Sequence, residues 1–171
     1  ELVGMAVVEQ QTGKQLGVVR DVYFDASWRL QGLIIENKGL FRHGRCIPLD
    51  KLSIGEDAIM VDGETDVHDL PNGVYTLYSG ENKLAGKPVM TKAGDGLGQI
   101  HDVYFLEEMG NLIGCELSDG LLSDLRNGRK VVPWSREVTV GEDVIFLPEE
   151  PAAEEAATEG QSVSQGVFGE E

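Results

Sequence analysis

The chain is short of positive charge and has no long apolar run. Its 171 residues include 14 Lys and Arg against 30 Asp and Glu, which gives a formal net charge of −16. Electrostatic binding to a phosphate backbone needs a basic surface, so we expect no direct contact with nucleic acid. A transmembrane helix needs a run of about 18 apolar residues or more. The sequence has no such run, so we expect no membrane insertion.

Cysteine is also scarce. Cys46 and Cys115 are the only two, and each lies within an apolar, strand-like run. A disulfide framework in so short a chain would need more cysteines, so we interpret both as small buried hydrophobic residues. This cysteine usage favours a reducing compartment, and we expect a cytoplasmic protein.

Motifs that carry chemistry are missing as well. Of the three histidines, His43, His68 and His101, only His43 has a second His or Cys at metal-ligand spacing, Cys46, and one such pair does not make a metal site. The glycines of residues 94–98 resemble a phosphate-binding loop, but they precede an expected strand and not a helix N-terminus that could hold an anion. No serine stands in a nucleophile motif. We therefore expect no enzyme activity, no cofactor and no metal site.

What the sequence does contain is an internal repeat. Residues 13–24, GKQLGVVRDVYF, recur as residues 94–105, GDGLGQIHDVYF, with seven of twelve positions identical. The correspondence continues through later segments, and its offset grows from 81 to 86 residues. A repeat of this kind indicates two copies of one structural unit. We assign copy one to residues 1–62, a linker to 63–83, copy two to 84–147 and an acidic, flexible tail to 148–171.

Each copy is expected to be all-β. Short apolar runs alternate with glycine-containing turns, and no helical period is present anywhere in the repeat. Many short strands favour a small closed barrel, because closure removes exposed strand edges. The predicted fold is two tandem six-stranded β-barrels followed by a disordered tail that contributes nothing to folding. In copy one, the runs that predict strands are residues 2–8, 16–24, 30–36, 45–49, 52–54 and 58–61.

The second strand of each copy contains a phase shift. Val19 and Val22 are apolar, as are their counterparts in copy two, yet an odd spacing cannot keep both on one face of a regular strand. One extra residue between them would restore the phase, so the sequence predicts a β-bulge there. Asp21 and Asp102 occupy this position in the two copies. We expect them to accept N–H groups freed by the bulge and not to act as catalytic carboxylates.

The repeated segments resemble the PRC-barrel family. The resemblance rests on residues 13–25, 33–36, 47–49 and 55–59, and its period is matched in both copies. The family is named for the cytoplasmic domain of the photosynthetic reaction-centre H subunit, and its fold also forms the C-terminal half of a bacterial ribosome-maturation factor. The resemblance implies a six-stranded barrel that serves as a scaffold or protein-binding module and carries no catalytic motif.

The expected function is therefore a non-catalytic adaptor that binds another protein. One alternative is an accessory factor in RNA or ribosome maturation, in which the acidic chain contacts a basic ribosomal protein and not the RNA itself. A weaker alternative, an accessory of a photosynthetic or other membrane complex, rests on the family name alone. Association with a second copy, as a homodimer, is left open.

Aromatic side chains are the candidate interface residues. Trp28, Phe41 and Trp134 lie near turns or strand ends, and the linker contributes Tyr75 and Tyr78. Such residues often anchor protein interfaces. They either contact an external partner or pack between the two barrels. We favour packing between the barrels for one tryptophan and one linker tyrosine at least, because a unit of about 60 residues is marginally stable alone.

Overall fold

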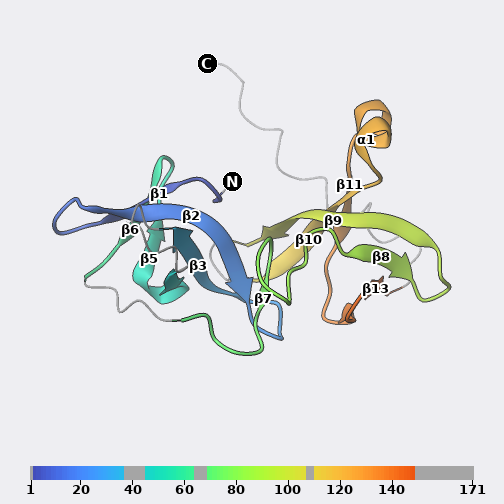
Figure 1. The fold of residues 1–171 in the computed structure, drawn as a ribbon, viewed down its shortest axis with the longest axis horizontal. Coiled ribbons are helices and arrows are strands. Elements are labelled where there is room, and N and C mark those ends of the chain that lie inside the picture. The colour runs from blue at the N-terminus through green and yellow to red at the C-terminus, as the bar shows by residue number, and fades with distance from the viewer. Residues whose placement is uncertain (1, 37–44, 64–68, 107–109, 149–171) are drawn as a thin grey trace, which may run out of the picture.

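The computed structural model describes residues 2–36, 45–63, 69–106 and 110–148. These residues form two β-units that lie side by side, with part of the linker between them (Figure 1). Each unit contains a six-stranded sheet, and a short linker strand, β7 (Tyr75–Thr76), adds to the first sheet. The predicted pair of tandem all-β units is confirmed. The tail predicted for residues 148–171 lies, from residue 149 onward, outside the described residues.

The first sheet has the strand order β4-β3-β2-β1-β6-β5. Neighbouring strands are antiparallel except β1 and β6, which run parallel. The first strand begins at Ala6, later than the sequence predicts, because the chain turns where the Met5 N–H donates to the Leu2 carbonyl (3.1 Å). The strands are β1 (Ala6–Glu9), β2 (Gln15–Phe24), β3 (Leu30–Glu36), β4 (Arg45–Pro48), β5 (Leu52–Ile54) and β6 (Ala58–Val61).

The second sheet repeats this order position by position, as β11-β10-β9-β8-β13-β12. Again one pair, β8 with β13, is parallel and the others are antiparallel. The strands are β8 (Pro88–Thr91), β9 (Gly96–Phe105), β10 (Leu112–Ser118), β11 (Lys130–Pro133), β12 (Thr139–Val140) and β13 (Ile145–Leu147). The internal repeat of the sequence is therefore a repeat of topology.

Each sheet forms a small barrel by curling its end strands toward each other. In the first unit the two end strands of the sheet, β4 and β5, are consecutive in the chain and are joined by the 3-10 helix η1 (Leu49–Lys51). Because this connection is so short, the sheet must curl until its end strands approach each other. The second unit has the same arrangement, with residues 134–138 connecting β11 to β12.

One helix interrupts the β-architecture, and the prediction of no helix within the repeat is wrong at this point. Helix α1 (Leu121–Asn127) projects from the second unit between β10 and β11 (Figure 1). The Asp124 carboxylate accepts hydrogen bonds from the Ser118 hydroxyl (2.6 Å) and the Asp119 N–H (3.2 Å), which ties the helix to the end of β10. Seven residues are about two turns, too few for a helical period to show in the sequence.

The apolar core is continuous between the two units. Buried side chains of both form one contact cluster, which includes Phe24 and Leu33 of the first unit and Leu117 and Ile145 of the second. All four are almost fully excluded from solvent. A unit this small buries too little apolar surface alone for ample stability, so we expect the shared core to stabilise both units.

The two longest strands contain the irregularity expected from the sequence. In β2 the register moves from Val19, opposite Ile35, to Asp21, opposite Ile34, which leaves Arg20 without a cross-strand partner. In β9 the register shifts in the same way at His101. The bulged strand bends at this point, and both aspartates follow directly after the extra residue.

Candidate binding cleft between the two units

Asp21 anchors the linker to the first unit. Its carboxylate is fully buried and accepts the Leu77 N–H (3.1 Å), the Tyr78 N–H (3.1 Å), the Ser79 N–H (2.8 Å) and the Ser79 hydroxyl (2.5 Å). It also accepts the N–H of its neighbour Val22 (2.8 Å). A buried carboxylate must be satisfied by donors, and here most of the donors come from a segment more than fifty residues away in sequence. The sequence predicts N–H groups as the partners of Asp21 but does not identify the linker as their source.

The captured linker segment is held from both sides. On one side β7 pairs with β2, Thr76 opposite Tyr23, and the Leu77 N–H donates to the Val22 carbonyl (3.3 Å). On the other side the Leu84 N–H donates to the Thr76 carbonyl (2.9 Å). The next N–H, that of Ala85, donates to the Leu77 carbonyl (2.8 Å). Strand β7 and the bend that follows it are thus held between the first unit and the start of the second.

The two units also touch each other directly. Arg29 and Asn111 form an antiparallel bridge. Beside it the Leu30 N–H donates to the Gly110 carbonyl (2.7 Å), and the Leu112 N–H donates to the Trp28 carbonyl (2.9 Å). These backbone bonds fix the relative position of the turns that precede β3 and β10.

Trp28, Tyr75 and Trp134 form an aromatic cluster between the units. The rings of Trp28 and Tyr75 have centroids 4.7 Å apart, and Trp28 meets Trp134 edge to face at 4.9 Å. Both tryptophans are buried and Tyr75 is half-buried. Of the five candidate aromatics, these three therefore contact one another where the two barrels meet.

The remaining two candidate residues lie elsewhere. Tyr78 is 43% exposed and borders a cleft between the units. Phe41 lies outside the described residues, so the structure gives it no position. Asp102, the counterpart of Asp21, is only half-buried and lines the same cleft. The repeat therefore does not give the two aspartates the same surroundings.

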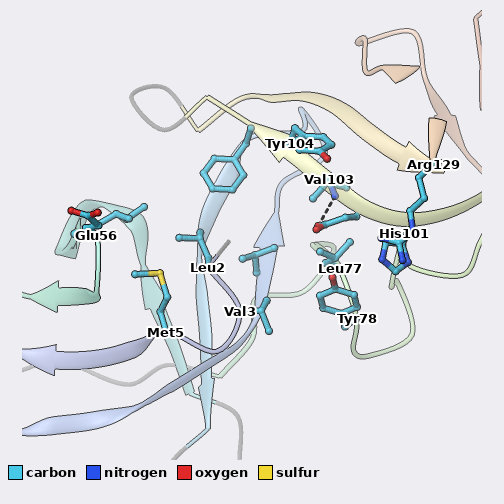
Figure 2. A pocket seen from close by; sticks show the side chains of 15 residues that line it. Leu2, Val3, Met5, Glu56, Leu77, Tyr78, His101, Val103, Tyr104 and Arg129 are labelled. Atoms are coloured by element: carbon cyan, nitrogen blue, oxygen red, sulfur yellow. Dashed lines mark hydrogen bonds between the residues drawn. The ribbon is translucent and has the colours of Figure 1, made fainter. Parts of the chain in front are cut away.

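The cleft has a volume of about 590 Å³ and is lined by both units. Figure 2 shows side chains from the start of the first unit, such as Leu2, Val3 and Met5, on one side and Tyr104 and His101 of β9 on the other. The complete lining is Leu2, Val3, Met5, Val22, Ile54, Gly55, Glu56, Leu77, Tyr78, His101, Asp102, Val103, Tyr104, Phe105 and Arg129. Polar and apolar groups contribute about equally to its surface, and Glu56, His101, Asp102 and Arg129 lie beside the apolar side chains. A concave site of mixed lining of this kind can bind a ligand that is both apolar and polar.

A hydrogen-bonded network stiffens the β9 wall. The Tyr104 hydroxyl donates to the Glu116 carboxylate (2.8 Å), and the Arg129 guanidinium donates to the other oxygen of that carboxylate (2.9 Å). The bond with Glu116 raises the pKa of Tyr104, and the same bond is the main reason why the pKa of Glu116 is lowered. Glu116 is therefore ionised and Tyr104 and Arg129 are protonated at neutral pH, so the network keeps its donors and acceptor.

The described residues bring together few groups that do chemistry. No cluster of three or more His, Cys, Asp or Glu in this part of the chain is placed to hold a metal ion. Cys46 and Cys115 are free and buried, and burial raises the pKa of the Cys115 thiol to about 12 and that of Cys46 above its usual range. A thiol that stays protonated is a poor nucleophile. Of the described groups considered for metal binding or catalysis, His101 and Asp102 lie in the cleft, whereas His43 and His68 lie outside the described residues.

A second exposed apolar surface lies on the second unit. Leu121 and Leu125, one turn apart on α1, are each 83% exposed, and Val131 of β11 is 59% exposed. Within the described ranges no helix is long and apolar enough to cross a membrane.

The fold and the repeat agree with the relationships of the sequence. Residues 1–68 and 80–152 each match the PRC-barrel domain, and these limits contain the copies assigned from the repeat. The chain belongs to the PRC-barrel family and carries the domain twice. It is similar to the uncharacterized protein YrrD of Bacillus subtilis (strain 168), with 30% identity over 151 residues that cover 86% of this chain and 84% of YrrD.

The sequence did not reveal the cleft. Its residues come from the chain start, the linker, β5, β9 and Arg129, and none of the aromatic candidates except Tyr78 lines it. One signal was present in the sequence. Asp21 and Asp102 are equivalent, but the aromatic and aliphatic stretch of residues 74–78 follows only copy one, within the linker.

Proposed function

We propose that this protein is a non-catalytic binding module that holds a segment of another protein in the cleft between its two units. The observation that carries the proposal is the cleft itself, because apolar side chains of both units and the exposed ring of Tyr104 converge there. An open groove that exposes apolar side chains on a protein surface is a usual site of protein contact, and its polar groups can add selectivity. The membership in a family of scaffold-like barrels supports the same function.

The charge of the chain narrows the class of partner. A net charge of −16 favours association with a neutral or basic protein and disfavours nucleic acid. A basic ribosomal protein is a partner of this kind. The net charge therefore also supports the alternative role in ribosome maturation. The third alternative, a membrane complex, has no observation of its own. The free, buried thiols of Cys46 and Cys115 fit a cytoplasmic setting.

A second copy of the chain is the other candidate partner. The exposed side chains of Leu121, Leu125 and Val131 favour it, because a small apolar patch of this kind is covered most simply by the same patch of a second molecule. Light scattering of the wild-type chain and of Leu125→Asp tests the homodimer. A mass that halves in the variant supports it, and a monomeric wild type rules it out.

The binding function is tested by affinity capture with a matched pair of variants. Tyr104 (43% exposed) lines the cleft, whereas Ile113 (44% exposed) on the neighbouring strand does not. We expect the wild-type chain and Ile113→Ala to retain the same captured protein at low and moderate salt, and Tyr104→Ala to lose it. Circular dichroism shows that both variants are folded. Equal capture by both variants, or capture no greater than that of an unrelated acidic protein, contradicts the proposal.

A further inference from the structure

The two aspartates of the repeat differ in what they bind. Asp21 accepts hydrogen bonds from four donor groups of the linker segment Leu77–Ser79, in addition to that of its neighbour Val22. Within the described residues Asp102 accepts only the equivalent neighbour bond, from the Val103 N–H (2.7 Å). The carboxylate of Asp102 is thus placed like that of Asp21 but has no captured segment.

The edge of β9 beside Asp102 also lacks a counterpart of the linker strand among the described residues. In the first unit β7 pairs with Tyr23 and Phe24 of β2 on the side away from β3. In the second unit β8 covers that side of β9 only as far as Gln99. In the described parts of the chain no strand pairs there with Tyr104 and Phe105, the counterparts of Tyr23 and Phe24. An uncovered strand edge offers backbone N–H and C=O groups to an incoming strand.

The N–H groups that hold the linker from its other side also have counterparts in the repeat. In the second unit the N–H groups of Leu84 and Ala85 donate to the captured linker. Their counterparts in the first unit are Leu2 and Val3, whose N–H groups have no acceptor among the residues described.

The backbone beside Leu2 and Val3 makes the same hydrogen bond as the backbone beside Leu84 and Ala85, so the two pairs correspond in structure as well as in sequence position. The Gly4 N–H donates to the Val19 carbonyl (2.9 Å), as the Gly86 N–H donates to the Ile100 carbonyl (2.8 Å). Leu2 and Val3 are therefore oriented as Leu84 and Ala85 are.

All these unused groups border one cleft. Leu2 and Val3 line it from the first unit, and residues 102–105 line it from the second (Figure 2). We propose that the cleft is a preformed strand slot that receives an extended segment of the partner protein as an added β-strand. The proposal rests on the proposed function and specifies its binding mode. A strand rises about 3.3 Å per residue, so about five residues span the groups that the slot offers.

The linker segment in copy one serves as a template for the chemistry of the occupant. Leu77 is 3% exposed, so the matching position of the occupant is aliphatic. Ser79 gives both its N–H and its hydroxyl to Asp21, so a serine or threonine follows two positions later to bind Asp102. The exposed Tyr78 between them places little restriction on that position. Main-chain bonds supply most of the affinity in such strand addition, and the side-chain positions supply the selectivity.

Charge favours a partner segment over the chain's own C-terminal residues. Ser162 and Val163 follow Thr76 and Leu77 by the same offset of 86 residues, so they are the competing occupant. However, Gln165 stands where the template has Ser79, and residues 148–171 carry seven Glu and no Lys or Arg. Residues 160–169 are themselves uncharged, but the glutamates on either side of them are disfavoured near Asp102 and Glu56 in a chain of net charge −16.

The test uses a synthetic peptide with the sequence of residues 74–80, VYTLYSG, titrated into the full-length chain. We expect saturable binding, with NMR shifts at the N–H groups of Leu2, Val3 and residues 103–105. Asp102→Asn should weaken binding by about tenfold or more, since a charge-assisted bond is lost. A peptide with alanine in place of its serine should bind more weakly to the wild-type chain, and Ile113→Ala should bind the original peptide as wild type does.

The outcomes separate the possible failures. No binding at millimolar peptide, or shifts confined to other surfaces, overturns the strand slot. If Tyr104-dependent capture of a protein still succeeds, the proposed function survives that result, whereas failure of both removes it. The full-length variant Val163→Asp tests the competing occupant. Peptide binding that appears only in this variant shows that the C-terminal residues fill the slot and overturns the assignment to a partner.

Discussion

Replacing Asp21 with asparagine should cost far more stability than the same change at Asp102. Asn keeps one oxygen, but its NH₂ group would face the Ser79 N–H and hydroxyl, which now donate to the second carboxylate oxygen at 2.8 and 2.5 Å. Bonds to a charged group contribute about 1.5–3 kcal/mol each, and a buried unsatisfied donor costs about 1–3 kcal/mol. We expect Asp21→Asn to lower the free energy of unfolding by about 3–5 kcal/mol, a large share of the stability of a small protein.

Asp102→Asn is the matched control. Among the described residues, Asp102 accepts only the Val103 N–H, and the amide oxygen of Asn can accept the same bond, so the cost should stay below about 1 kcal/mol. Urea denaturation followed by tryptophan fluorescence measures both variants, because Trp28 and Trp134 are buried where the two units meet. Should Asp21→Asn be too unstable to fold, Ser79→Ala gives a smaller version of the same loss. Costs for the two aspartates that agree within about 1 kcal/mol would refute the anchoring role of Asp21.

Three further results are expected. A Cβ at Gly32 would lie 2.1 Å from a carbonyl oxygen of β4, so Gly32→Ala should lower the free energy of unfolding, measured in urea, by about 3 kcal/mol. A Cβ at Gly96 would enter open space, so Gly96→Ala should change that free energy by less than about 0.5 kcal/mol. Equal effects of the two variants would contradict the close strand packing at Gly32. A double-mutant cycle of Trp28→Ala and Trp134→Ala should give a coupling energy of about 0.5–1.5 kcal/mol, and no coupling would mean that the rings do not meet in solution. Because burial raises the pKa of Cys115 to about 12 from an ordinary 9.0, its contribution to stability is present below about pH 9 and is lost as pH rises toward 12; Cys115→Ala should show a smaller decline in urea midpoint over that range, and an identical decline would contradict a buried thiol.

The strands could be predicted from the sequence because their signals are local. The repeat of residues 13–24 as 94–105 fixed the two longest strands, and the mismatch between Val19 and Val22 located the bulge in β2. Alternating apolar residues and glycine turns report directly on the pleat of a strand. The same local signals placed most strands of the first unit within one residue of their positions.

The site depends on contacts that no local signal carries. Asp21 meets its linker donors across 56 to 58 residues, and the cleft forms only when the start of the chain approaches β9. The aromatic candidates were recognised as interface residues, but composition could not tell an internal interface from an external one. Helix α1 could not be predicted because it is only seven residues long, too short for a helical period to show. Its leucines, Leu121 and Leu125, are exposed, so no buried apolar face marks the helix in the sequence.

The aromatic cluster and the cleft exist only if the two units form one body. The most direct measurement is urea unfolding of the intact chain beside two fragments, residues 1–80 and 81–171. Because the core cluster and the Trp28–Trp134 contact cross between the units, we expect the intact chain to unfold in one transition at a higher urea concentration than either fragment. Burying one such ring contributes about 2–3 kcal/mol, enough to separate the midpoints. Two independent transitions, each unchanged in its isolated fragment, would contradict a shared core and the cleft that depends on it.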